Sequence, residues 1–226
     1  TLDAIIGNPD IYFKISGNRK NTRDERQIDF PRLYNGSGMS VRTLKGLWSI
    51  TRPGNMLICA ASVVCGGIIG GKPVERILSL ATNPDSPEFI LLICAAFSAS
   101  LILAAGNVLN DVRDVACDTV NAPGRPLPSG MISVKTAAFF SVILAFTGIL
   151  ISIPLGVRGF GIAVAAVLVL ALYDLKLKGV PIAGNIAVSS LGAFAFIYGG
   201  VAGNSVSQAI IPAVFAFLFH LGREIV

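Results

Sequence analysis

Apolar runs, each about as long as a membrane-spanning helix, alternate with short polar segments from residue 47 onward. A helix needs about 20 mostly apolar residues to cross the hydrocarbon core of a bilayer. Six runs are predicted to cross, at 47–71, 89–110, 134–155, 159–173, 182–200 and 207–222. The sequence GGVAGNS separates the last two, which otherwise form one stretch without Asp, Glu, Lys or Arg. The pattern therefore predicts an all-α, multi-pass transmembrane helix bundle.

Small residues are frequent within these runs, as in CGGIIGG, AAFSAS and SSLGAFAF. In lipid, small side chains let helix backbones approach closely. We therefore expect the helices to pack into a compact bundle.

The composition agrees with a membrane protein, since 14% of the residues are charged and the mean hydropathy is +0.71. Soluble domains carry about 25% charged residues. The net charge of +5 comes from basic residues between the apolar runs, without a nucleic-acid-binding motif, so no nucleic-acid partner is expected. Alternating spans place four basic groups on one side, which the positive-inside rule assigns to the cytoplasm. These groups are Arg42, Lys45 and Arg52; Arg113, Arg125 and Lys135; Lys176 and Lys178; and Arg223.

Residues 1–40 differ from the remainder because they are polar and lack an apolar run of signal-peptide length. We expect this segment to lie outside the core and assign it no function. The membrane domain is expected to occupy residues 41–226.

Three aspartates stand where the second apolar run ends, in the sequence NDVRDVACD. Asp111, Asp114 and Asp118 are spaced i, i+3, i+7, which places them on one face of a helix. Three carboxylates on one stripe repel one another, and a divalent cation would offset that repulsion. Oxygen ligands favour Mg²⁺, which often shares its ligands with substrate phosphates. Asn110 can add a neutral oxygen, so the sequence predicts a Mg²⁺ site formed by these four residues.

Cations are expected to converge on the same face, namely Arg52, Arg125, Lys178 and Arg223. Arg forms paired hydrogen bonds to phosphate oxygens, and Lys acts as a point charge. Metal and cations together describe a diphosphate site, and the apolar bundle beneath it could hold a long hydrocarbon tail. The predicted substrate is a polyprenyl diphosphate, whose departing charge the site would stabilise. Tyr173 either supports the resulting allylic cation with its ring or anchors the membrane interface.

Other interpretations stay open at this point. The acids could form a solvated helix end and pair with Arg113 and Arg125. Each basic residue could act only in topology, the role we assign to Arg113 and Lys176. A different class of protein is an ion-coupled transporter, although its acids would be expected in mid-span. A structural membrane subunit would leave the aspartate spacing unexplained.

Two motifs together resemble the first signature of the UbiA superfamily of intramembrane prenyltransferases. They are NDxxDxxxD at 110–118 and NxPxRPLPSG at 121–130. Further similarities are Arg52-Pro53 in the first apolar run, the segment YDLKLKGVPIAGN at 173–185, and REI at 223–225. The resemblance covers roughly residues 45–226.

The resemblance implies a bundle of about nine helices, Mg²⁺ dependence and transfer of a prenyl group to an acceptor. It implies that Asn110 and the three aspartates are catalytic and hold metal and diphosphate. The residues implied to bind substrate are Arg52, Asn121, Arg125, Tyr173, Lys178 and Arg223. The motifs look most like the branch that transfers geranylgeranyl to geranylgeranylglyceryl phosphate to make ether lipids in the cell membrane. Aromatic acceptors, as in quinone-type branches, remain possible.

The family's second aspartate motif is expected just after REI, whereas the sequence ends at Val226. Residues 41–226 are therefore expected to be the N-terminal two-thirds of the prenyltransferase domain. These 226 residues are expected to hold half of the metal site and not to catalyse alone.

Overall fold

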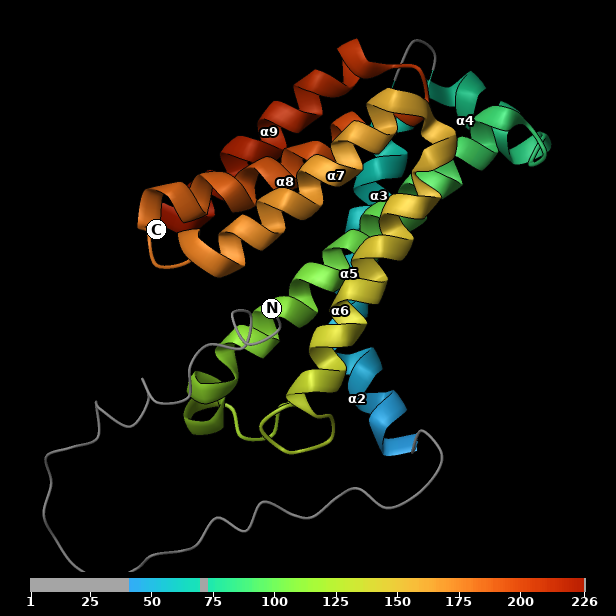
Figure 1. Cartoon of the computed structure of the whole chain (residues 1–226). Coiled ribbons are helices and arrows are strands. Elements are labelled where there is room, and N and C mark those ends of the chain that lie inside the picture. Colours follow the sequence, from blue (N-terminus) through green and yellow to red (C-terminus); the bar gives the residue numbers. More distant parts are fainter. Residues whose placement is uncertain (1–40, 70–72, 226) are drawn as a thin grey trace, which may run out of the picture.

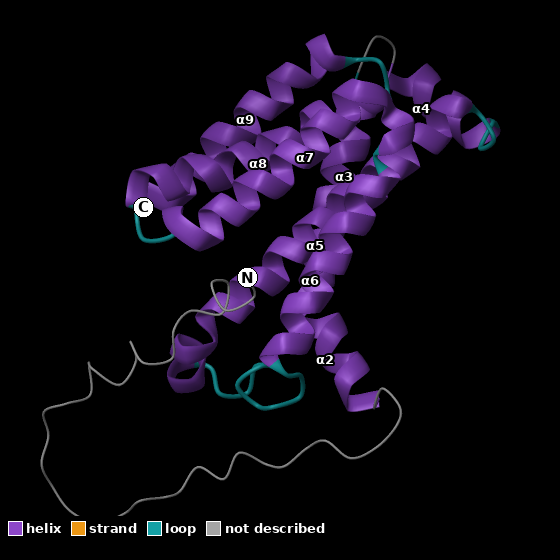
Figure 2. Cartoon of the chain, in the orientation of Figure 1, coloured by secondary structure: helices purple, strands orange, loops and turns teal. Residues whose placement is uncertain are grey.

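The computed structural model describes residues 41–69 and 73–225, which are almost entirely helical and contain no strand (Figures 1 and 2). The predicted polar segment at 1–40 lies outside the described residues. The helices are α2 (Val41–Thr51), α3 (Pro53–Ile68), α4 (Pro73–Thr82), α5 (Pro87–Asn121), α6 (Val134–Ile151), α7 (Gly156–Leu172), α8 (Pro181–Ala202) and α9 (Val206–Ile225). A 3₁₀ turn, η2 (Ile153–Leu155), precedes α7, and a π-helical turn, η3 (Tyr173–Leu177), follows it.

The six predicted apolar runs correspond to α3 and α5–α9, which confirms the all-α membrane architecture. Four stretches among the described residues are long and apolar enough to cross a bilayer: Pro87–Asn121, Val134–Leu177, Ile182–Ala202 and Val206–Arg223. The second of them contains both α6 and α7. The chain reverses between these helices at Gly156, whose φ of 71° favours glycine (Figure 1).

The first predicted run, 47–71, is not one helix. It divides at Arg52 into the end of the amphipathic helix α2 and the shorter apolar helix α3. The α region is disfavoured for a residue that precedes proline, and Arg52 has a left-handed backbone with φ 55° and ψ 68°. The break positions this side chain for the site described below. The structure also differs from the predicted pattern between the first two runs, where the short helix α4 occupies a segment expected to be a loop.

Close backbone contact between α3 and α8 confirms the prediction that small residues pack the helices together. A Cβ atom added at Gly199 would overlap the Val63 carbonyl of α3. One added at Gly66 would overlap the Phe196 carbonyl of α8 in the same way. Alanine at these positions would therefore force the two helices apart.

The longest helix, α5, packs antiparallel to α6 and contacts α2, α3, α7 and α8 (Figure 1). Its 35 residues extend about 52 Å at 1.5 Å per residue. The hydrocarbon core of a bilayer is about 30 Å thick. The last turns of α5 can therefore project beyond the membrane while its first 20 or so residues span it.

Candidate functional site

The charged end of α5 carries the three predicted carboxylates on one helical face. Asp111 and Asp118 are buried, with 7% and 8% of their surface exposed, and Asp114 is half-buried. A buried carboxylate is costly unless it is paired. Each of the three has a basic partner from a different segment of the chain.

Arg52 reaches Asp111 from the break between α2 and α3. Its Nη2 donates to Oδ1 of Asp111 at 2.5 Å. The break is fixed to α5 by Asn107, whose Nδ2 donates to the Thr51 carbonyl at 3.0 Å. Asn107 precedes Asp111 by one helical turn, so the two side chains lie on the same face of α5. Asn107 holds the backbone at the break, and Asp111 holds the Arg52 guanidinium.

Lys178, which directly follows the π-helical turn η3, contacts Asp114. Its Nζ lies 2.5 Å from both carboxylate oxygens of Asp114 and 2.8 Å from Oδ1 of Asn110. Asn110 also donates through Nδ2 to Oδ2 of Asp114 at 3.1 Å. The turn itself is closed by a bond from the Lys178 amide to the Tyr173 carbonyl at 2.9 Å. Single π-helical turns are frequent at functional sites.

Arg125 reaches Asp118 from the loop between α5 and α6. Its Nη1 donates to Oδ2 of Asp118 at 2.6 Å, and this bond raises the pKa of the Arg125 guanidinium. Two backbone hydrogen bonds hold the loop. The Arg125 amide donates to the Ala122 carbonyl and the Ser129 amide donates to the Arg125 carbonyl, both at 3.0 Å. Leu127 anchors it in the apolar cluster that α2, α5 and α6 share.

The predicted convergence of Arg52, Arg125 and Lys178 on the aspartates is therefore observed. The solvated-helix-end interpretation anticipated the pair between Arg125 and Asp118, but it did not anticipate the burial of Asp111 and Asp118. Asn121 ends α5 and donates to Sγ of Cys117 at 3.1 Å.

Tyr173 and Arg223 are the other two residues predicted to bind substrate. Tyr173 begins the π-helical turn and is half-buried. Arg223 is exposed in the last turn of α9. Substrate binding by either side chain stays a prediction.

The donor set on α5 fits Mg²⁺ by its chemistry, because Asn110 and the three aspartates supply hard oxygen ligands. Within 41–69 and 73–225, no three acidic, His or Cys side chains form a group that could hold a metal by themselves. Mg²⁺ is usually held through one or two carboxylates together with substrate phosphates. A site of this kind would be completed only when a diphosphate is bound.

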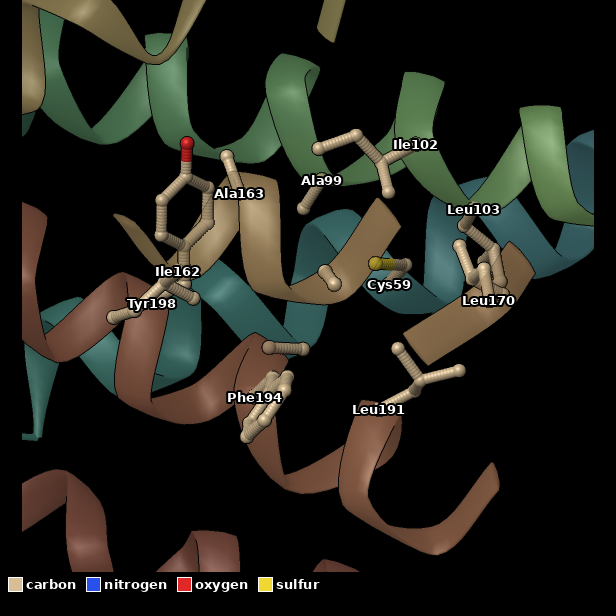
Figure 3. A pocket seen from close by; sticks show the side chains of 12 residues that line it. Cys59, Ala99, Ile102, Leu103, Ile162, Ala163, Leu170, Leu191, Phe194 and Tyr198 are labelled. Atoms are coloured by element: carbon tan, nitrogen blue, oxygen red, sulfur yellow. The ribbon is translucent and has the colours of Figure 1, made fainter. Parts of the chain in front are cut away.

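An apolar pocket lies among α3, α5, α7 and α8 (Figure 3). Tyr198 of α8 points its hydroxyl toward α5 and donates to Oγ of Ser98 at 2.8 Å. Ala99 of α5 also lines the pocket, 12 residues before Asp111, or about 18 Å along the helix. The pocket lining is Cys59, Ala99, Ile102, Leu103, Ile162, Ala163, Ala166, Leu170, Leu191, Phe194, Ala195 and Tyr198.

Asp174 is a site residue that sequence reasoning missed. It lies in the π-helical turn, is 4% exposed, and lines a pocket beside Asp114 and Lys178. Arg113 and Lys176, interpreted from the sequence as topology determinants, line the same pocket. One signal could have found Asp174, because it is the only acidic residue between Asp118 and Glu224.

Fold and site together define a multi-pass helical membrane protein that gathers carboxylates and cations at one end of an apolar bundle. The chain belongs to the UbiA prenyltransferase family, whose family model matches residues 77–225. This membership confirms the resemblance stated from the motifs.

Similar proteins carry a more specific name. A digeranylgeranylglyceryl phosphate synthase of Sulfolobus acidocaldarius is 44% identical over 185 residues, which cover 81% of this chain and 62% of that protein. The synthase of Thermococcus gammatolerans is 35% identical over 183 residues, with the same two coverages. A solved structure of a digeranylgeranylglyceryl phosphate synthase is 31% identical, with a TM-score of 0.69 over 81% of this chain and 61% of that one. The chain thus spans about three-fifths of the length of these relatives.

Proposed function

We propose that the whole protein is a Mg²⁺-dependent prenyltransferase of membrane ether-lipid biosynthesis. It transfers a geranylgeranyl group from geranylgeranyl diphosphate to geranylgeranylglyceryl phosphate. The observation that carries the proposal is the charged face of α5, where three carboxylates meet cations from three separate segments. Family membership and the names of the relatives support the same reaction.

The diphosphate binds at this charged end. Arg52, Arg125 and Lys178 supply guanidinium and ammonium groups for its oxygens, while Asp111, Asp118 and Asp114, respectively, keep those groups in place. Mg²⁺ held by Asn110 and the aspartates would supply neutralisation of the diphosphate charge. In the reaction, the bond between C1 of the prenyl group and the diphosphate oxygen breaks, and the electron pair leaves with the diphosphate. The acceptor hydroxyl oxygen then bonds to C1 as an ether and releases its proton.

The prenyl tail extends from the charged end toward the apolar pocket. Ala99 lies about 18 Å along α5 from Asp111, which is about the length of an extended C20 chain. The cavity itself encloses about 60 Å³. Ligand pockets usually enclose about 300–1,000 Å³. The lining side chains therefore move apart when the tail enters.

The orientation proposed for the site is cytoplasmic. Arg52, Arg125 and Lys178 lie at the same end of the bundle, as the alternation of spans requires. Basic residues are enriched on the cytoplasmic side of membrane proteins. A cell-membrane location then allows both substrates to reach the site from the same leaflet.

The proposal is tested with the whole protein in detergent, radiolabelled geranylgeranyl diphosphate and geranylgeranylglyceryl phosphate. A doubly prenylated ether lipid that forms with Mg²⁺ and not with EDTA is the expected product. Turnover only with an aromatic acceptor such as 4-hydroxybenzoate would keep the prenyltransferase and overturn the lipid acceptor. If no prenylated product forms with any acceptor, the assignment as a prenyltransferase is refuted and a transporter is favoured.

A further inference from the structure

The Asp174 carboxylate has a polar atom that the fold does not satisfy. Its Oδ1 is buried and has no hydrogen-bond partner among the described residues. Buried polar atoms in native proteins are nearly always paired, because an unpaired one loses its hydration without compensation. The charges of Lys178, Arg113 and Arg52 act on Asp174, as does that of Asp114. None of these interactions gives Oδ1 a hydrogen bond, so it is a buried acceptor that the described residues leave unsatisfied.

The pocket that Asp174 lines combines acidic, basic and apolar side chains. It encloses about 310 Å³ and is lined by Arg113, Asp114, Asp174, Leu175, Lys176, Lys178 and Gly179. Asp174 is the buried residue of this set, while Leu175 and Lys176 are exposed at its edge. Lys178 and Asp114 are already bonded to each other. The lining also offers a ligand a buried acceptor, the cationic side chains of Arg113 and Lys176, and an apolar edge.

We propose that this pocket binds the headgroup of the phospholipid acceptor, with Asp174 accepting a hydrogen bond from its hydroxyl and Lys176 and Arg113 binding its phosphate. The assignment rests on the proposed function for the identity of the reaction. It adds where the acceptor sits and which residues recognise it, in a pocket that shares Asp114 and Lys178 with one of the three ion pairs on α5.

The chemistry of the acceptor matches this order of groups. A singly prenylated glyceryl phosphate carries its free hydroxyl on the carbon beside the phosphate-bearing carbon. A carboxylate repels phosphate and accepts a hydrogen bond from a hydroxyl, so Asp174 suits the alcohol and the cations suit the phosphate. Leu175 is 43% exposed and Ile182, at the start of α8, is 75% exposed. These apolar side chains give the acceptor's hydrocarbon chain a surface next to the headgroup pocket.

The test is direct binding to the whole protein in detergent without donor. Geranylgeranylglyceryl phosphate is titrated into the wild type and into Asp174→Ala, Asp174→Asn and Lys176→Gln. Loss of the hydrogen bond to Asp174 should raise the Kd about tenfold in Asp174→Ala. Asn keeps a carbonyl oxygen, so Asp174→Asn should retain part of the affinity. Lys176→Gln should raise the Kd several-fold, and Lys135→Gln, an exposed lysine of α6 outside the pocket, should not.

Two further readouts separate recognition from a structural role. The Kd for geranylgeranyl diphosphate should stay within about twofold of the wild type in Asp174→Asn. Its melting temperature should not fall, because the carboxyl group that it replaces is buried with an unsatisfied Oδ1. Unchanged acceptor affinity in Asp174→Ala, or an equal loss of donor and acceptor affinity, would overturn the proposal.

Competition distinguishes a lipid site from a site for free phosphate. Glycerol 1-phosphate should compete weakly and inorganic phosphate more weakly still. If inorganic phosphate competes as well as the lipid, the pocket does not recognise the acceptor. Asp174-dependent binding in a protein without transfer activity would keep the pocket and refute the proposed function. Normal transfer by Asp174→Ala at an unchanged acceptor KM would keep the proposed function and refute the acceptor pocket.

Discussion

Replacing Arg52 with Gln removes the guanidinium that lies 2.5 Å from the Asp111 carboxylate. The Asp111 side chain is 9% exposed and that of Arg52 is 39% exposed. Breaking a fully buried pair costs about 3–5 kcal/mol, whereas exposed pairs contribute about 0.2–1 kcal/mol. The asymmetry of exposure places this pair between those limits. We expect Arg52→Gln to lower the free energy of unfolding by about 1–2 kcal/mol.

A double-mutant cycle with Asp111→Asn isolates the pair from other effects of either substitution. The double variant should lose about 1–2 kcal/mol less than the sum of the two single losses, because the pair can be lost only once. For a chain of this size, a difference of 1 kcal/mol corresponds to roughly 2–4 °C in melting temperature. Thermal unfolding is followed by helical circular dichroism in detergent, without substrate or metal.

Lys45→Gln is the matched control, since Lys45 is an exposed cation on the adjacent helix α2. It should leave the melting temperature within about 1 °C of the wild type, as most surface substitutions do. Additive losses in the cycle, or an Arg52→Gln variant as stable as Lys45→Gln, would refute the coupling between the break at Arg52 and α5.

Three other predictions follow from the same structure. Gly199→Ala should lower the melting temperature by several degrees, because its Cβ overlaps the α3 backbone, while Gly161→Ala, where a Cβ meets open space, should not; equal thermal shifts would contradict the close contact. Lys178→Gln should raise the KM for geranylgeranyl diphosphate at least tenfold by removing the ammonium held over Asp114, and a steady-state assay that finds an unchanged KM would exclude Lys178 from the diphosphate site. Ala99→Leu should fill the apolar pocket and reduce transfer from a C20 donor more than from a C10 donor, and an equal reduction for both lengths would place the tail elsewhere.

The sequence predicted the membrane helices well because twenty-residue apolar runs have few alternative structures. It also predicted that Asp111, Asp114 and Asp118 share a helical face, since that follows from helical periodicity alone. The convergence of Arg52 and Lys178 on that face followed from the alternation of spans across a membrane. Sequence pattern therefore sufficed wherever periodicity or topology decides the geometry.

The features that the sequence did not predict depend on tertiary contacts. Pro53 gives a local reason for the break at Arg52, but no local signal indicates that Asn107 ties this break to α5 through the Thr51 carbonyl. The π-helical turn after α7 buries Asp174, although its sequence YDLKLK has the pattern of an interfacial loop. Specific partners, such as Lys178 for Asp114, require distances that only the folded chain supplies.

The most direct test of the charged end of α5 is calorimetric binding of geranylgeranyl diphosphate to the whole protein. We expect binding with Mg²⁺, loss of that binding in EDTA, and a Kd at least tenfold higher in Asp114→Asn than in Lys45→Gln. Equal affinity with Mg²⁺ and with EDTA, together with an unchanged Kd in Asp114→Asn, would contradict the assignment of this end as the diphosphate site.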